Sequence, residues 1–237
     1  MNKVQPTVAG SDTQQQFEHA VRRAKYVLPL YIVVPALFAL GFYAGGVDMD
    51  WKAFGLGALG WVIALVLRGP VSALVMKMPR EKGTAIVTGS SGVLEEGVRV
   101  AMLLLTSTAF GWAASFGQGW AAVEVLFVIV NVIALAALAP KTDEKSMQAK
   151  EMLKQQGQLS AGPIWGVIER VFASAFHIGC TLLVAKYPWW AAALIPLHSL
   201  VNLAAVKYAK TSIYKVELLM AIAGTVMLVV GLAVFAA

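Results

Sequence analysis

The chain has 237 residues, of which 59% are hydrophobic and 14% are charged, and its mean hydropathy is +0.71. Soluble domains carry about 25% charged residues, so this composition excludes an ordinary soluble protein and predicts an all-α, polytopic membrane protein in a lipid bilayer. The net charge of +6 is not read as nucleic-acid binding, because Lys and Arg of membrane proteins mark the cytoplasmic side. The single cysteine, Cys180, excludes an intrachain disulfide.

Seven apolar stretches come close to the 20 or so residues that a membrane-spanning helix needs. They run approximately over 26–46, 53–76, 84–110, 117–138, 162–185, 188–208 and 214–236. In the second stretch, "LRGP" (67–70) indicates either a kink or an end near Leu67. Gly55, Gly57 and Gly60 of the same stretch predict close packing against another helix. Residues 1–25 form a polar N-terminal segment ahead of one transmembrane domain, 26–237.

The connections between the stretches are alternately rich and poor in Lys and Arg, beginning with a rich N-terminal segment. The positive-inside rule then predicts about seven spanning helices with a cytoplasmic N-terminus and an external C-terminus. We expect an integral protein of a bacterial cytoplasmic (inner) membrane. The loop 140–161 is the one long polar connection and is expected in the cytoplasm. Its residues 143–156 are either a surface helix or a solvated linker.

Ionisable residues inside the apolar stretches are the strongest functional signal. Each charged group at the membrane centre costs about 2.5–3.5 kcal/mol, so such residues are rare and usually face the bundle interior. The third stretch alone holds Glu95, Glu96 and Arg99. The next three stretches add Glu124 and Asn131, then Glu169, Arg170 and His177, then His198 and Asn202.

Helical spacing places several of these residues on common faces. Glu95 and Arg99 are four residues apart and are predicted to pair, whereas Glu96 projects about 100° away from Glu95. The polar residues on the following three helices are also spaced so that they form inward-facing stripes. Asn131 is expected to belong to one of these stripes. The core site helices, about 84–208, are therefore expected to share one polar cavity.

Two structural alternatives stay open at this point. If the third helix begins near Val93, the two glutamates lie in water at a helix N-terminus, where carboxylates are mildly stabilising. Glu169 and Arg170 are equally well explained as an ion pair that only bridges helices.

A carboxylate and two imidazoles in a buried, wet cavity are suited to hydrolysis. The carboxylate takes a proton from water, the water attacks a peptide carbonyl, and an imidazole or an Asn amide stabilises the oxyanion. The same Glu95, His177 and His198 could instead hold Zn²⁺, since two His and one Glu form a known catalytic ligand set. No HExxH motif is present, so chemistry without a cofactor is the first expectation and zinc the alternative.

Four motifs, in this order, resemble the YhfC-type branch of the CAAX-protease-like, glutamic-type intramembrane proteases. They are "EEGVR" (95–99), "FGQGWAAVE" (116–124), "ERVFASAFH" (169–177) and "HSLVN" (198–202). The resemblance implies an intramembrane endopeptidase built as an all-helical bundle, acting on a membrane-associated peptide or protein. It implies Glu95 or Glu96 as the water-activating base, Arg99 as the residue that orients them, and His198 with Asn202 as the oxyanion site. His177 matches the histidine that follows the Glu-Arg pair.

The sequence departs from that family pattern at two points. The spacing from the glutamate pair to Arg99 is one residue shorter than in the CAAX-protease consensus. Trp120 stands where the branch is expected to have a His, while the surrounding glycines and Glu124 are kept. Trp neither accepts a proton nor binds a metal. Two other functions are therefore weighed: an inactive membrane scaffold or binding protein on the same fold, and a proton-coupled transporter. The transporter lacks the inverted repeats that many transporters show.

Overall fold

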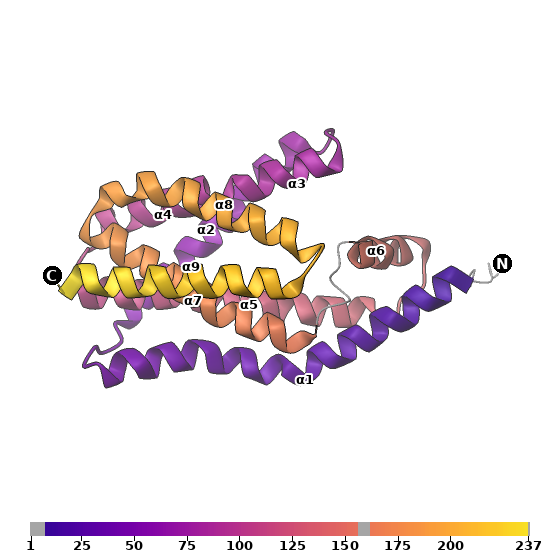
Figure 1. The fold of residues 1–237 in the computed structure, drawn as a ribbon, viewed down its shortest axis with the longest axis horizontal. Helices are drawn as coiled ribbons and strands as arrows, with labels where there is room; N and C mark the ends of the chain where they lie inside the picture. The colour runs from indigo at the N-terminus through magenta and orange to yellow at the C-terminus, as the bar shows by residue number, and fades with distance from the viewer. Residues whose placement is uncertain (1–7, 156–161, 237) are drawn as a thin grey trace.

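The computed structural model describes residues 8–155 and 162–236, and within these ranges the chain is helical without any strand. The helices are α1 (Val8–Ala44), α2 (Trp51–Val75), α3 (Arg80–Gly89), α4 (Ser91–Leu105), α5 (Phe110–Leu138), α6 (Glu144–Gln155), α7 (Pro163–Lys186), the short 3-10 helix η1 (Pro188–Trp190), α8 (Ala191–Ala209) and α9 (Ile213–Ala236). Figure 1 shows them as one elongated bundle. The fold is thus a helical membrane bundle, as the sequence predicts.

Six of the described helices, rather than seven, are long and apolar enough to cross a membrane: α1, α2, α5, α7, α8 with η1, and α9. The expected continuous helix over 84–110 is wrong. The chain forms α3 and α4 instead, and α4 has 15 residues, or about 22 Å at 1.5 Å per residue, against a hydrocarbon core of about 30 Å. Ser90 and Ser91 explain the break, because their hydroxyls donate to the carbonyls of Val87 and Thr88 and compete with the helical pattern.

The N-terminal part of the molecule is helical well before the apolar stretch begins. α1 starts at Val8 rather than near residue 26, and its polar portion packs against α6. Lys150 of α6 is buried and donates from Nζ to the Gln14 side chain and to the carbonyls of Ala139 and Lys141. Of the two alternatives for 143–156, the helix is therefore the correct one. Residues 1–7 of the predicted N-terminal segment and 156–161 of the predicted loop lie outside the described residues.

The start of α6 is fixed by Asp143. Its carboxylate accepts hydrogen bonds from the Ser146 hydroxyl at 2.6 Å and the Ser146 N–H at 3.2 Å. These bonds hold the pKa of the Asp143 carboxyl below its ordinary value.

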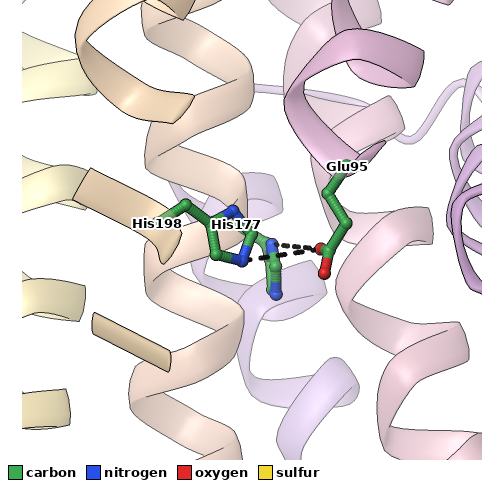
Figure 2. A group of neighbouring side chains, drawn as sticks. All are labelled: Glu95, His177 and His198. Atoms are coloured by element: carbon green, nitrogen blue, oxygen red, sulfur yellow. Dashed lines mark ion pairs between the residues drawn. The ribbon is translucent and has the colours of Figure 1, made fainter. Parts of the chain in front are cut away.

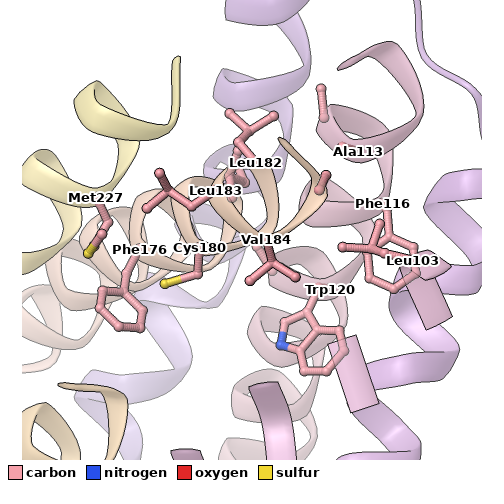
Figure 3. Packing of buried hydrophobic residues seen from close by; sticks show 14 of the residues in the cluster. Leu103, Ala113, Phe116, Trp120, Phe176, Cys180, Leu182, Leu183, Val184 and Met227 are labelled. Carbon is pink, nitrogen blue, oxygen red and sulfur yellow. The ribbon is translucent and has the colours of Figure 1, made fainter. Parts of the chain in front are cut away.

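α7 is the central helix of the bundle. Of its most apolar 18 residues 72% are buried, against 11–22% for the other candidate spans, and it contacts α1, α4, α5 and α9. A large apolar cluster surrounds its second half, and Figure 3 shows Phe176, Cys180 and Leu183 of α7 in this cluster. This position places His177 of α7 in the interior.

Glycines set the approach of α2 to α5. A Cβ on Gly57 would overlap the backbone of Phe116, and one on Gly119 would overlap the backbone of Phe54. Gly60 lies against Trp120, whereas a Cβ on Gly55 would meet nothing within 4 Å. The predicted close packing is therefore confirmed for Gly57 and Gly60 and is wrong for Gly55.

α2 itself runs through "LRGP" to Val75, so the alternative of an end near Leu67 is excluded.

Candidate functional site

Five helices bring their polar side chains to one cavity of about 120 Å³ in the interior of the bundle. α2 contributes Arg68, α4 contributes Glu95, and α5 contributes Glu124. From α7 come Glu169, Arg170 and His177, and from α8 His198 and Asn202. The structure thus assembles residues from all four helical regions that the sequence singled out. It adds α2, which the sequence analysis left out.

The centre of the cavity is formed by Glu95, His177 and His198, which Figure 2 shows pointing toward one another from three helices. Glu95 Oε2 lies 3.9 Å from His177 Nδ1 and 3.7 Å from His198 Nε2. One ligand atom from each residue falls within 4.8 Å of the other two. All three side chains are buried, and Glu95 Oε2 has no hydrogen-bond partner.

The remaining nitrogen of each imidazole faces its own carboxylate. His177 Nε2 lies 2.6 Å from Glu124 Oε2, and His198 Nδ1 lies 2.8 Å from Glu96 Oε1. Glu96 accepts a hydrogen bond from His198 Nδ1, which places the N–H of the neutral His198 ring on Nδ1. Arg99 Nη2 can only donate, so its contact with His177 Nδ1 makes that nitrogen the acceptor and leaves the N–H of neutral His177 on Nε2, beside Glu124. The lone-pair nitrogens, His177 Nδ1 and His198 Nε2, then both face Glu95.

The predicted pairing of Glu95 with Arg99 is wrong. Arg99 Nε lies 3.3 Å from Glu96 Oε2, and Glu95 pairs with Arg68 of α2. The reason is the direction of the Arg99 side chain, which is turned toward α7. There its Nη1 donates to the His177 carbonyl at 2.8 Å and to the Thr181 hydroxyl at 3.1 Å.

Glu95 and Glu96 therefore belong to the interior, with relative exposures of 3% and 0%. The alternative that placed them in water at a helix N-terminus is excluded.

Arg170 links the remaining acidic residues of the site. Its Nη1 donates to Glu124 at 2.5 Å, and its Nη2 pairs with Glu169. Glu124 also contacts His177, so the Glu169–Arg170 ion pair is connected through Glu124 to the centre of the site. It is therefore more than an isolated bridge between helices. Glu169 is the most accessible of the three, with its side chain 29% exposed.

Asn202 connects α8 to the junction of α3 and α4. Its Nδ2 donates to the Ser91 hydroxyl at 2.8 Å, and Ser199 donates to the Gly89 carbonyl at 2.7 Å. A Cβ on Gly92 would overlap the backbone of Ile195, so the two helices touch at this point. These contacts fix His198 relative to the glutamates of α4.

Trp120 is fully buried beside the site and lies behind Arg99, whose guanidinium carbon is 4.6 Å above the centroid of the indole ring. Its place in the apolar cluster is visible in Figure 3. Trp120 therefore does not occupy the cavity, which is lined by Trp61 on the α2 side. Asn131, in contrast, is exposed on α5, and its predicted place on the inward polar stripe is wrong.

The donor set fits a divalent cation. Two imidazoles and a carboxylate are a ligand set of catalytic zinc, and their outward nitrogens carry the carboxylate partners typical of metal-bound histidines. Within the described chain, four carboxylates of the cluster face only three guanidinium groups, which leaves a surplus of negative charge. Oε2 of Glu95, Glu96 and Glu124 all lack a hydrogen-bond partner, and Glu95 Oε2 is the one that faces both histidines, where a cation would be held. Arg99 Nη2, 3.1 Å from His177 Nδ1, competes for the same lone pair.

A comparison with protein-family models agrees with this geometry. The model described as YhfC intramembrane metalloprotease matches residues 30–224, a range that contains every residue of the cavity. The chain belongs to the YhfC family. Searches of curated proteins and of solved structures give no significant match. The YhfC family's description supports the metal alternative over the first expectation of no cofactor.

Sequence reasoning missed three polar residues of this region. Arg68 was seen only as an interruption of an apolar stretch, although it is an ionisable residue inside one. Thr181 carries no such signal, because threonine is common in apolar helices. Glu217 of α9 is buried without a hydrogen-bond partner for either carboxylate oxygen, and its single charge near the start of an apolar stretch was the available sign.

Proposed function

We propose that this protein is a metal-dependent intramembrane endopeptidase that hydrolyses a peptide bond of a membrane-associated protein. The observation that carries the proposal is the buried, unpartnered Glu95 Oε2, which faces the lone-pair nitrogens of His177 and His198. Membership of the YhfC family supports the same reaction class.

Glu95, His177 and His198 would hold the metal, and zinc is the ion that this ligand set suits best. When bound, zinc supplies an activated water and polarises the peptide carbonyl. Glu96 and Glu124 keep the two imidazoles in the required tautomer and orientation. Arg99 pairs with Glu96, and Arg170 is shared between Glu124 and Glu169.

Asn202 lines the cavity, and its Nδ2 carries two N–H groups, so one remains to donate to the oxyanion of the peptide while the other bonds Ser91.

A metal-free version of the reaction uses the same residues differently. Glu95 Oε2, free of hydrogen bonds, would take the proton from water directly, as the resemblance to CAAX-protease-like glutamic proteases implies. This metal-free alternative includes the proposal that the protein belongs to the CAAX-protease-like superfamily.

Trp120 favours a second candidate, the inactive scaffold. His177 counts against this scaffold candidate. It supplies an imidazole to the cavity from α7, so the cluster does not need a histidine at position 120.

The test combines metal content with cleavage. Purified protein in lipid nanodiscs is stripped with a chelator, reloaded with zinc and assayed on membrane-tethered peptide reporters. We expect about one zinc per chain, cleavage that zinc restores, and loss of both in Glu95→Gln and His198→Gln. Glu217→Gln, which removes a buried carboxylate outside the cluster, serves as the matched control.

Cleavage that survives metal removal but is lost in Glu95→Gln would select the metal-free mechanism. Absence of cleavage across broad reporter sets, together with an unchanged cellular role of Glu95→Gln, would select the scaffold.

A further inference from the structure

A second and larger hollow lies outside the polar cluster. It is a groove of about 580 Å³ between α3 and the last turns of α8. Three cations line it, Arg80 from α3 and Lys207 and Lys210 from the α8 end, against one acidic residue, Glu81. Among the residues that the structure describes, none of these four forms a salt bridge.

Charged and apolar residues are separated along the groove. Arg80 is the first residue of α3, Lys207 lies in the last turn of α8, and Lys210 follows that helix. At the other end Leu203 approaches Gly89, the last residue of α3, since a Cβ there would lie 3.7 Å from Leu203 Cδ1. α3 and α8 are thus antiparallel here, with the cations toward one end of the groove and Leu203 toward the other; Thr84 and Thr88 of α3 also line it.

The rim coincides with the end of a candidate span, because the apolar stretch of α8 ends at Ala209. Phospholipid headgroups lie at this level of a membrane, and basic pockets between helices there suit anionic ones. The residues around the rim, Arg80, Lys207 and Lys210, are exposed.

We propose that this groove binds an anionic phospholipid, with the phosphate between Arg80, Lys207 and Lys210 and an acyl chain along Leu203 and Val206. The excess of cations selects a negative headgroup, and the apolar lining residues Ala85, Leu203 and Val206 select a lipid over a free phosphate. The site is additional to the proposed hydrolysis and does not depend on it.

The lipid would also hold together two elements that carry the polar cluster. α3 continues into α4 with Glu95, and α8 carries His198. The hydrogen bonds of Ser199 to Gly89 and of Asn202 to Ser91 already join these elements next to the groove.

The experiment is native mass spectrometry of the detergent-purified protein titrated with phosphatidylglycerol or with phosphatidylcholine. We expect phosphatidylglycerol to be retained preferentially. The triple variant Arg80→Gln/Lys207→Gln/Lys210→Gln should weaken this binding by at least about tenfold, since each cation near a membrane surface contributes roughly fivefold. The control Arg22→Gln/Arg23→Gln/Lys25→Gln removes three exposed cations from α1 and should change it less than about twofold.

A second variant, Ala85→Trp, fills the groove and leaves every charge in place, so it should also weaken phosphatidylglycerol binding. It decides the question if the triple variant does not fold. Equal retention of the two lipids, equal loss in both triple variants, or full binding in Ala85→Trp would overturn the proposal. Binding of inorganic phosphate as tightly as phosphatidylglycerol would equally overturn it, because the acyl chain would then contribute nothing to binding.

Discussion

His177 and His198 use both ring nitrogens, and this double use gives the site its chemical character. One nitrogen of each ring contacts a carboxylate, Glu124 or Glu96, and the other faces Glu95. A histidine that only fills a core needs no such arrangement. Carboxylate partners of this kind orient metal-bound imidazoles and raise their basicity.

Glu124→Gln therefore tests the site at the level of one residue. A neutral amide is a weaker acceptor for His177 Nε2, so zinc affinity should fall about 10- to 100-fold. The matched control is Glu169→Gln, because Glu169 also pairs with Arg170 but has no contact with either histidine among the described interactions. Competition for zinc against a chelator of known affinity measures both variants. Equal losses of zinc affinity in Glu124→Gln and Glu169→Gln would show that the loss arises through Arg170 instead.

Sequence reasoning found the charged residues of the centre because each stands in an apolar stretch, where an unpaired charge is costly. It did not find their partners. Residues three and four apart on a helix are both neighbours, so spacing alone did not separate Glu96 from Glu95 as the partner of Arg99. The choice is made by α7, which draws Arg99 toward His177 and Thr181.

At the level of helices, close packing depends on particular glycines. α2 and α5 touch through Gly57 and Gly119, and this contact brings Trp120 and Glu124 of α5 to the site. Glycines permit such backbone contact because they have no Cβ.

Gly57→Ala should destabilise the protein by about 1–3 kcal/mol, the usual cost of overpacking a well-packed interior. Gly55→Ala, two residues away on the same helix, meets nothing within 4 Å and should be neutral or stabilising by up to about 1 kcal/mol. Thermal denaturation in one detergent compares the two. If both alanines destabilise equally, helix backbone effects rather than the α2–α5 contact are responsible.

The ends of most helices were predictable to within a few residues, because hydropathy changes sharply there. α5, α7, α8 and α9 illustrate this, apart from an earlier start of α5. The break between α3 and α4 was missed although its sign was present, because "TGSSG" (88–92) interrupts the apolar stretch with glycines and serines that favour turns. The polar start of α1 was missed because hydropathy marks only apolar helices. This part of α1 packs against α6 instead.

At the level of the whole molecule, the number of membrane passages depends on whether α3 and α4 together complete one. Figure 1 shows the start of α1 and the end of α9 at opposite ends of the bundle. Six long helices alone would return the chain to its starting side. If α3 and α4 together make a seventh, broken passage, the number of passages is odd, as the distribution of Lys and Arg predicts.

Two introduced cysteines decide this in intact cells. The native Cys180 is fully buried and gives no background with a membrane-impermeant maleimide. With a cytoplasmic N-terminus and seven passages, Thr108→Cys, in the exposed turn after α4, should be labelled from outside. Lys77→Cys, in the exposed connection between α2 and α3, should be labelled only after permeabilisation. Only α3 and α4 separate these two positions, so labelling of both from the same side would show that α3 and α4 do not cross the membrane.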